Sequence, residues 1–371
     1  MRRSPLVLLA AICLGSVGTA ADLPVMTAVV VAKLLTMNDA DDIFQPGMVV
    51  MEGSKITYVG PPKRLPVRAL VLEYPTGWAS PGLVDLHTHI HGSMRDTNDM
   101  VRAVNPELRV RPCVVPGNRA VRMGCATGVT TLFGIPGSGT NMGGFGVLYK
   151  AKLDGPTYEE IVLRDPGGLK IAQDSNPAGR NATDFGISRA GMGWNLIDVN
   201  DRAVAALAQG RFDPALEMLK RVHAKELPVL IHTAGSEGVV NTARMWRGTY
   251  DTISTVSHGS FDGWKAARAL AQMGMPVNHG PRTMDFQSSR NGRINGSSAE
   301  FVAAGVPLFS LNTDSPVVPE EEFFLQGAMS ARYGGDPYLM LRAMTIHPAQ
   351  IFRIDHRVGS LEVGKDGDVV V

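Results

Sequence analysis

The chain has 371 residues, of which 44% are hydrophobic and 19% charged, and its formal net charge is +1. This length fits one large domain with a minor one, and the composition is that of an ordinary globular protein. No dense basic run follows the first few residues. The sequence therefore argues against a nucleic-acid-binding protein.

The first residues have the pattern of a targeting segment. "MRR" is a short basic region, "PLVLLAAICLGSVG" is an apolar run too short to span a bilayer, and "GTAAD" offers small residues for cleavage. We interpret residues 1–21 as a signal peptide, with an uncleaved anchor as the alternative. We therefore expect a secreted or periplasmic protein with no stable membrane span after cleavage, in which Cys113 and Cys125 are either paired or free buried thiols.

The two ends of the remaining chain share a β-rich character. Residues 26–74 consist of short β-branched runs broken by Gly, Pro and Asn-Asp turns, and residues 357–371 read "RVGSLEVGKDGDVVV". We predict that residues 22–79 and 357–371 form one discontinuous β-sandwich domain. Because the chain ends inside a strand, we expect the C-terminal part of this domain to be truncated.

Residues 80–356 alternate apolar strands with helix-like stretches such as 202–207, 214–225 and 261–273. The predicted strands are 84–89, 130–136, 145–150, 169–172, 228–233, 253–258, 276–279 and 307–314. Eight β/α units of this length predict an α/β fold, a closed parallel (β/α)8 barrel of the TIM type. An open doubly wound sheet is the alternative.

Histidines on alternate positions end the first barrel strand, in "SPGLVDLHTHIHGS". Alternate residues of a strand point to the same face, so His87 and His89 project together from the strand end at which barrel enzymes keep their chemistry. Their ring nitrogens can converge on one metal ion. We expect Asp85 on the same face, accepting a hydrogen bond from a ligand histidine, and we interpret His91 as a loop residue.

Three later strands also end on a polar residue. "LPVLIHTAG" ends with His232, "TISTVSHGS" with His258 and "VPLFSLNTDSP" with Asp314. Imidazoles and a carboxylate suit Zn²⁺ and, less selectively, Fe²⁺, Co²⁺ or Mn²⁺. Such a site activates water, and Asp314 can carry its proton to a leaving nitrogen. The pattern predicts metal-assisted hydrolysis, whereas the G-x-S-x-G and H-E-x-x-H motifs of rival hydrolases are absent from the sequence.

Taken in order, the motifs "PGLVDLHTHI", "GVTTLFGIPGS", "VLIHTAG", "VSHGS", "NTDSP", "TIHPAQIF" and "VGSLEVGKDGDVVV" resemble the amidohydrolase superfamily. "GSGTNMGGFGVLYK" and "GLKIAQDSNP" resemble its imidazolonepropionase-like subgroup. The resemblance implies a distorted (β/α)8 barrel beside a small β-sandwich. It implies His87 and His89 as first-strand metal ligands, His232 and His258 as fifth- and sixth-strand ligands, and Asp314 as ligand and proton carrier.

Many members of this superfamily hold two metals bridged by a carboxylated lysine on the fourth strand. In "GGLKIAQD" the resemblance places Lys170 at that position, and a lysine that faces solvent or pairs with a neighbour is the alternative. The chain departs from its relatives at Asp174-Ser175-Asn176, where the subgroup has "GEN", and at Ala234, where a second histidine is common. These changes leave the choice between one and two zinc ions open.

Further side chains are candidates for contact with substrate. Asn141 precedes the glycine-rich "MGGFG", which we interpret as a loop close to the site rather than a phosphate cradle. His279 ends the seventh strand and Arg282 follows it, where its guanidinium could hold a carboxylate. We expect His258 or His279 to stabilise the oxyanion.

The sequence thus predicts an exported, metal-dependent hydrolase, with zinc as the favoured ion, that cleaves a carbon–nitrogen bond in a small molecule. The substrate would be an amide of a cyclic compound, an N-acyl amino acid or a dipeptide. A deaminase that uses the same metal site is the alternative enzyme. A catalytically silent metal- or ligand-binding protein and a metal-free structural module are alternatives from other classes, and the chain could form a homo-oligomer.

Overall fold

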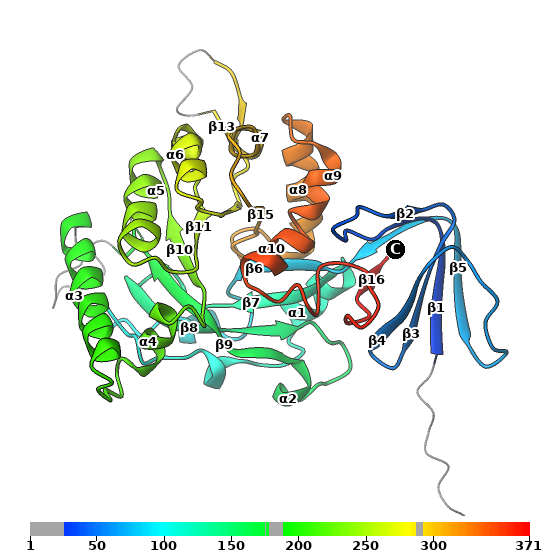
Figure 1. The fold of residues 1–371 in the computed structure, drawn as a ribbon, viewed down its shortest axis with the longest axis horizontal. Coiled ribbons are helices and arrows are strands. Elements are labelled where there is room, and N and C mark those ends of the chain that lie inside the picture. The colour runs from blue at the N-terminus through cyan, green and yellow to red at the C-terminus, as the bar shows by residue number, and fades with distance from the viewer. Residues whose placement is uncertain (1–25, 175, 178–187, 287–291) are drawn as a thin grey trace, which may run out of the picture.

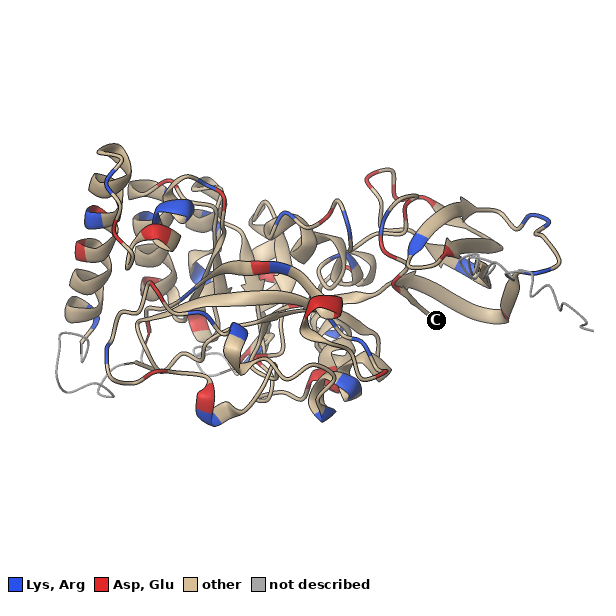
Figure 2. Cartoon of the chain, turned by 90° about the horizontal axis from the view of Figure 1, so that it is seen from below, with Lys and Arg blue, Asp and Glu red and all other residues tan. Residues whose placement is uncertain are grey.

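A computed structural model describes residues 26–174, 176–177, 188–286 and 292–371. The predicted signal peptide and Ser175 lie outside these residues. Two sheets organise the described chain, a small one built from its two ends and a larger one that curves around the middle (Figure 1). Acidic and basic residues are interspersed over both parts (Figure 2).

The small sheet joins the two ends of the chain, as predicted. Its strands run in the order β16, β5, β1, β3, β4, with β2 paired to β1. Val369 and Val370 near the C-terminus pair antiparallel with Pro81 and Ser80 of β5. The strands are β1 (Met26–Leu35), β2 (Ile43–Phe44), β3 (Gly47–Glu52), β4 (Lys55–Gly60), β5 (Leu70–Pro81) and β16 (Val369–Val370). The two-layered sandwich is not confirmed, because these described residues form one mixed sheet.

The larger sheet has eight strands among the described residues, in chain order from one edge to the other. They are β6 (Leu83–Thr88), β7 (Val129–Gly134), β8 (Met142–Lys150), β9 (Val162–Ala172), β10 (Val229–Thr233), β11 (Ser254–His258), β12 (Val277–His279) and β15 (Phe309–Leu311). Each of them overlaps a predicted strand. A parallel bridge between Thr88 and Ser315 joins the first strand to the segment after the last, so the barrel is nearly closed.

The expectation of a fully parallel barrel is wrong at one strand. β8 runs antiparallel to both β7 and β9. The link 135–141 contains no helix, and between β8 and β9 only the short α2 (Tyr158–Ile161) occurs. A parallel connection needs a crossover of a dozen or more residues, whereas an antiparallel one needs only a short turn. The short connections therefore explain the reversal of β8.

The glycine-rich run that we interpreted as a loop forms the first half of β8. Gly144 has φ +102°, and a Cβ there would lie 2.5 Å from the carbonyl oxygen of Leu108. The segment 104–109 bridges to this strand at Met142 and Phe145. Glycine is needed at this position because another backbone segment approaches the strand too closely for a side chain.

Helices follow most of the other strands. They are α1 (Arg119–Ala126), α3 (Arg189–Ala208), α4 (Glu217–His223), α5 (Ser236–Ala243), α6 (Ala267–Gln272), α7 (Ser297–Ala303), α8 (Phe323–Arg332), α9 (Pro337–Arg342) and α10 (Ile346–Ile351). The 3-10 helices are η1 (Met94–Asp96), η2 (Arg111–Cys113), η4 (Phe261–Ala266) and η5 (Glu320–Glu322), and η3 (Arg244–Thr249) is a π-helix. β13 (Met284–Asp285) and β14 (Asn295–Gly296) form a two-stranded ribbon.

The outer and inner faces of the barrel strands have different side chains. Val229 and Ile231 of β10 belong to the core cluster that includes helix residues such as Leu196 of α3. Leu230 and His232 lie on the opposite face, and Leu230 is in register with Lys170 of β9. Apolar residues fill the beginning of this inner face, and histidine and lysine occupy its carboxyl end.

Cys113 and Cys125 are both free thiols, but each is half-buried and not fully buried as the second alternative expected. No helix within the described ranges is both long and apolar enough to cross a membrane. The domain boundaries at residues 79/80 and 356/357 stay predictions, although β5 continues across the first of them to Pro81.

Candidate metal centre

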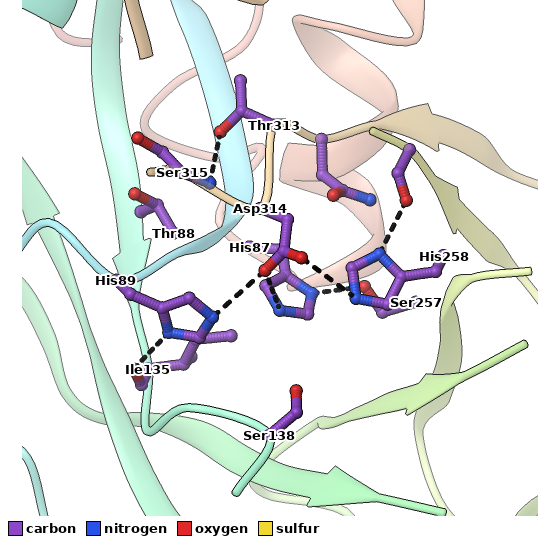
Figure 3. A network of polar contacts seen from close by, with 12 residues as sticks. His87, Thr88, His89, Ile135, Ser138, Ser257, His258, Thr313, Asp314 and Ser315 are labelled. Carbon is purple, nitrogen blue, oxygen red and sulfur yellow. Dashed lines mark hydrogen bonds and ion pairs between the residues drawn. The ribbon is translucent and has the colours of Figure 1, made fainter. Parts of the chain in front are cut away.

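The predicted ligand residues meet at the carboxyl ends of the barrel strands, and Figure 3 shows His87, His89, His258 and Asp314 among them. The candidate ligands form two groups, and within each group the ligand atoms lie within 4.8 Å of one another. One group is His87, His232 and His258, and the other is His87, His89 and Asp314. The side chains come from four strand ends far apart in the sequence, so the fold itself assembles them. His87 belongs to both groups and lies at the centre of the cluster.

Asp314 is the shared neighbour of the histidine rings. Its Oδ1 lies 3.2 Å from Nε2 of His89 and 3.3 Å from Nε2 of His87, and its Oδ2 lies 3.9 Å from Nε2 of His258. The His232 ring lies 4.4 Å from the His258 ring, centroid to centroid. Several lone pairs therefore converge on one small volume, as a bound cation requires.

The second ring nitrogen of three histidines is fixed by an outer partner. Nδ1 of His89 donates to the carbonyl oxygen of Ile135 at 3.0 Å, and Nδ1 of His258 donates to that of Gly280 at 2.6 Å. Nδ1 of His87 lies 2.6 Å from Oγ of Ser257. A carbonyl partner fixes the tautomer with the proton on Nδ1 and leaves the Nε2 lone pair free for a metal.

The backbone is strained at two of these positions. His258 has φ +76° and Asp314 has φ +52°, conformations that residues with a Cβ adopt rarely. Such strain costs about 1–3 kcal/mol per residue and persists where the surrounding structure enforces it. The backbone at the end of β11 and in the turn after β15 therefore directs the side chains of His258 and Asp314 into the cluster.

Burial sets the charge state of the cluster. It lowers the pKa of His87, His232 and His258, which are also near one another, so their rings are neutral at neutral pH. Burial opposes ionisation of Asp314, but the neighbouring His258 and His89 outweigh it and lower the pKa of that carboxyl below its ordinary value. Neutral imidazoles and an ionised carboxylate are the forms that bind a divalent cation.

Lys170 of β9 reaches the same cluster. Its Nζ lies 3.1 Å from Nε2 of His87 and 3.0 Å from Oγ of Ser138, and its side chain is fully buried. Burial lowers the pKa of the Lys170 amine to about 7. The solvent-facing alternative is therefore wrong, and the amine is held against a histidine of the metal cluster. Sequence reasoning missed Ser138, which lies in the link between β7 and β8.

Contrary to expectation, Asp85 does not accept a hydrogen bond from a histidine ring. Its Oδ1 accepts the backbone N–H of His87 at 2.7 Å, and its Oδ2 accepts the backbone N–H and the hydroxyl of Thr313 at 2.9 and 2.6 Å. The pairing of β6 with β7 is irregular between Asp85 and Thr88, as at a β-bulge, and the strict alternation of faces is lost there. Asp85 thus anchors the turn that precedes Asp314 instead of a histidine ring.

A second buried carboxyl, Glu320 of η5, belongs to this anchor and was not found from the sequence. Its Oε2 accepts the Thr88 hydroxyl at 3.0 Å and lies 3.5 Å from that of Thr313. Burial, and then the nearby Asp85, raises the pKa of Glu320 well above its ordinary value, and burial raises that of Asp85 to about 7. The acid pair therefore retains protons in the folded state at pH values where the unfolded chain has lost them.

The Glu320→Gln variant is expected to change how stability depends on pH. A raised folded-state pKa stabilises the wild type below about pH 4.5, and this contribution is lost as pH rises, by about 1.4 kcal/mol per pH unit for one group. Glutamine does not titrate, so the melting temperature of the variant should rise relative to the wild type between pH 5 and 8. Thermal unfolding of chelator-treated protein would measure this.

Glu321→Gln provides the matched control for this comparison, because Glu321 is an exposed neighbour on the same turn. Its melting curve should follow that of the wild type at each pH. Parallel pH profiles for wild type and Glu320→Gln would show that the buried carboxyl titrates normally and would contradict the expectation.

A pocket of about 250 Å³ opens beside the metal cluster. Its walls include His232, His258 and Asp314, together with Asp174 and Arg282. Asp174 is ion-paired with Arg189 at 3.5 Å. Of the three predicted substrate-binding residues, the structure brings Arg282 to this pocket.

Asn141 and His279 lie elsewhere. Nδ2 of Asn141 donates to the carbonyl oxygen of Ala172 at 2.7 Å, which ties the start of β8 to the end of β9. Nδ1 of His279 donates to the carbonyl oxygen of His258 at 2.6 Å, and its ring packs edge-on against Phe301. Neither residue lines the pocket among the described residues, and His279 supports the backbone of His258.

Comparison with known proteins agrees with this geometry. The model of the amidohydrolase family matches residues 209–371. The crystal structure of an amidohydrolase from Thermotoga maritima MSB8 superposes with a TM-score of 0.81 at 25% sequence identity, over 93% of each chain. The chain is therefore similar to the amidohydrolase family over residues 209–371, and its fold resembles that of the Thermotoga maritima amidohydrolase.

Other solved structures share the fold of the present chain at lower sequence identity to it. A molinate hydrolase gives a TM-score of 0.57 at 18% identity, over 94% of this chain and 89% of its own. A prolidase complexed with N-methylphosphonate-L-proline gives a TM-score of 0.57 at 14% identity, over 93% and 92%. No curated protein matches the chain in sequence.

Proposed function

We propose that this protein is an exported metal-dependent enzyme that hydrolyses a carbon–nitrogen bond, most readily the amide of an N-acyl amino acid or a dipeptide. The observation that carries the proposal is the pair of ligand groups that share His87. Export is proposed from the pattern of residues 1–21 alone. Similarity to the amidohydrolase family over residues 209–371 supports the reaction type.

The residues present fit a divalent cation, and zinc is the ion we propose. Nδ1 of His232 and Nε2 of His258 are buried and have no hydrogen-bond partner among the described residues. A buried polar atom without a partner is costly, and a metal bond would satisfy each of them. Four histidine rings and one carboxylate are the donor set that zinc favours.

His87, His89, His232, His258 and Asp314 would hold the ion or ions. When bound, a divalent cation polarises a carbonyl and activates water near neutral pH. Asp314 accepts the proton of the attacking water at its carboxylate and passes it to the leaving nitrogen, which departs as an amine. His258 has no N–H left for the carbonyl oxygen, because its Nδ1 donates to Gly280 and its Nε2 would hold the ion, so the expected oxyanion role of this ring is not part of the proposal.

Lys170 is proposed to bridge two ions as a carbamate. Its neutral amine adds carbon dioxide and releases one proton, which converts a buried amine into an anionic ligand. The contact of Nζ with His87 and the hydroxyl of Ser138 beside it support this role. Nζ would otherwise remain a buried amine among metal ligands, where a positive charge would oppose the binding of a cation.

The proposal is tested on purified protein by metal analysis and an activity screen. We expect one or two equivalents of zinc, hydrolysis of N-acyl amino acids or dipeptides, loss of activity with a chelator and recovery on adding zinc back. Release of ammonia in place of an amine and a carboxylic acid would show a deaminase. Bound metal without turnover of amides, dipeptides or cyclic ureides would favour a silent binding protein, and protein without metal would exclude the metal centre.

A further inference from the structure

A second hollow adjoins the pocket beside the metal cluster. It measures about 380 Å³, and the two cavities share Pro281 and Arg282 as a common wall. We call it the distal chamber, and define it by Met284, Phe286, Leu325 and Met329, which line it beyond that wall. A molecule that reaches from the metal cluster past Arg282 would therefore enter the distal chamber.

The distal chamber is lined by large apolar side chains that solvent still reaches. Phe286 is 61% exposed and Leu325 is 51% exposed. Arg282 is the one charged residue among the described residues that line it. Covering such side chains with an apolar group is favourable by about 25 cal/mol for each Å² removed from water. The chamber therefore suits a hydrocarbon or aromatic group.

The guanidinium of Arg282, which lies between the two cavities, is available to bind a ligand. Its guanidinium lies over the ring of Phe261, 5.0 Å from the centroid, and Phe261 also lines the pocket of the metal cluster. Within the described part of the chain, Arg282 forms no ion pair. A guanidinium stacked on a ring keeps its N–H donors in the plane, where they can bind both oxygens of a carboxylate.

We propose that the substrate is an N-acyl derivative of a large apolar amino acid with a free carboxylate. In such a molecule the carboxylate and the side chain branch from the carbon next to the amide nitrogen. This connectivity matches the position of Arg282, which lines both cavities. The amide would lie at the cluster of candidate metal ligands, the carboxylate would bind Arg282, and the side chain would fill the distal chamber. The inference rests on the proposed function, which supplies the hydrolytic site.

The test compares kcat/KM for N-acetyl-L-phenylalanine, N-acetyl-L-leucine, N-acetylglycine and N-acetyl-L-leucinamide on zinc-loaded enzyme. We expect the leucine and phenylalanine compounds to exceed the glycine compound by about 10- to 100-fold, the effect of burying one large apolar side chain. The leucinamide lacks the carboxylate and should be a poor substrate. Equal rates for all four would overturn the proposal.

Two variants separate the two contacts. Arg282→Gln should lower kcat/KM for the carboxylate substrates by about 100-fold and leave that for the leucinamide unchanged, because only the former lose a charge-assisted bond. Leu325→Gln should reduce the preference for phenylalanine over glycine at least threefold. Arg268→Gln and Leu153→Gln, exposed changes on α6 and after β8, serve as controls. Equal losses on all substrates would contradict the assignment.

A binding measurement keeps this inference separate from the proposed function. Titration calorimetry of N-acetyl-L-phenylalanine into chelator-treated protein requires no turnover. Binding that is present in the wild type, absent in Arg282→Gln and weakened in Leu325→Gln would support the chamber even if no amide were hydrolysed. Failure of the wild type to bind would overturn the inference even if another amide were hydrolysed.

Discussion

Replacing His87 with alanine is expected to remove metal from both halves of the cluster. His87 is the one residue that belongs to both ligand groups found among the described residues, whereas His89 and His232 each belong to one. Loss of an outer partner of a metal ligand costs about 10- to 100-fold in metal affinity or activity, and loss of the ligand itself should exceed this. His87→Ala should therefore lose more metal than His89→Ala or His232→Ala.

Metal content by mass spectrometry, with kcat/KM on the best substrate, measures this effect. His91→Gln is an informative comparison, because His91 is next in the same alternating row but belongs to neither ligand group. His356→Ala, an exposed change, controls for handling of the protein. Full metal content in the His87→Ala protein would refute the ligand assignment and, with it, the hydrolase proposal.

Asp314→Asn is expected to lower kcat by about 10²- to 10⁴-fold, the range that general acid–base groups contribute. The change keeps the shape of the side chain but removes the carboxylate that accepts the proton. The histidines around it hold the pKa of Asp314 below its ordinary value, so the wild-type group is already ionised at pH 5. Steady-state kinetics with saturating zinc would separate loss of the base from weaker metal binding.

The control for this variant is Asp251→Asn, a carboxylate on the surface that pairs with Lys225 at 2.6 Å. It should retain wild-type kcat and metal content. If Asp314→Asn keeps its metal and also its kcat, Asp314 is a ligand without a role in proton transfer, and another group must carry the proton.

The positions of the barrel strands and the meeting of the candidate metal ligands could be predicted because both depend on local sequence. Each strand is a short apolar run that ends at a turn, and each ligand is the polar residue at that end. The carboxyl ends of parallel strands gather at one rim, so His232, His258 and Asp314 could be expected to meet His87.

The direction of β8 and the role of Asp85 depend on features that a period-two pattern does not contain. The reversal of β8 follows from the length of its connections, and the position of Asp85 follows from an irregular pairing of β6 with β7. Attention to the missing helix between residues 135 and 141 would have indicated the hairpin. The irregularity leaves no comparable signal in the apolar pattern.

Glu320 and Ser138 were missed for another reason. Each meets its partner across a long stretch of chain, Glu320 at Thr88 and Ser138 at Lys170. An acidic run such as 320–322 is usually a solvated turn, and one serine in a glycine-rich link has no distinguishing pattern. Their parts in the site become visible only when the barrel closes around them.

The closure of the barrel has a consequence for how the protein holds together. The seam between its first and last strands is secured by the Thr88–Ser315 bridge and by the backbone N–H of His89, which donates to Ser315 at 2.8 Å. His89 and Asp314 lie on opposite sides of that seam, so an ion held by both would link the first strand to the segment after the last one. The free energy of binding such an ion would add to that of folding, so the availability of metal would govern the stability of the fold as well as any activity.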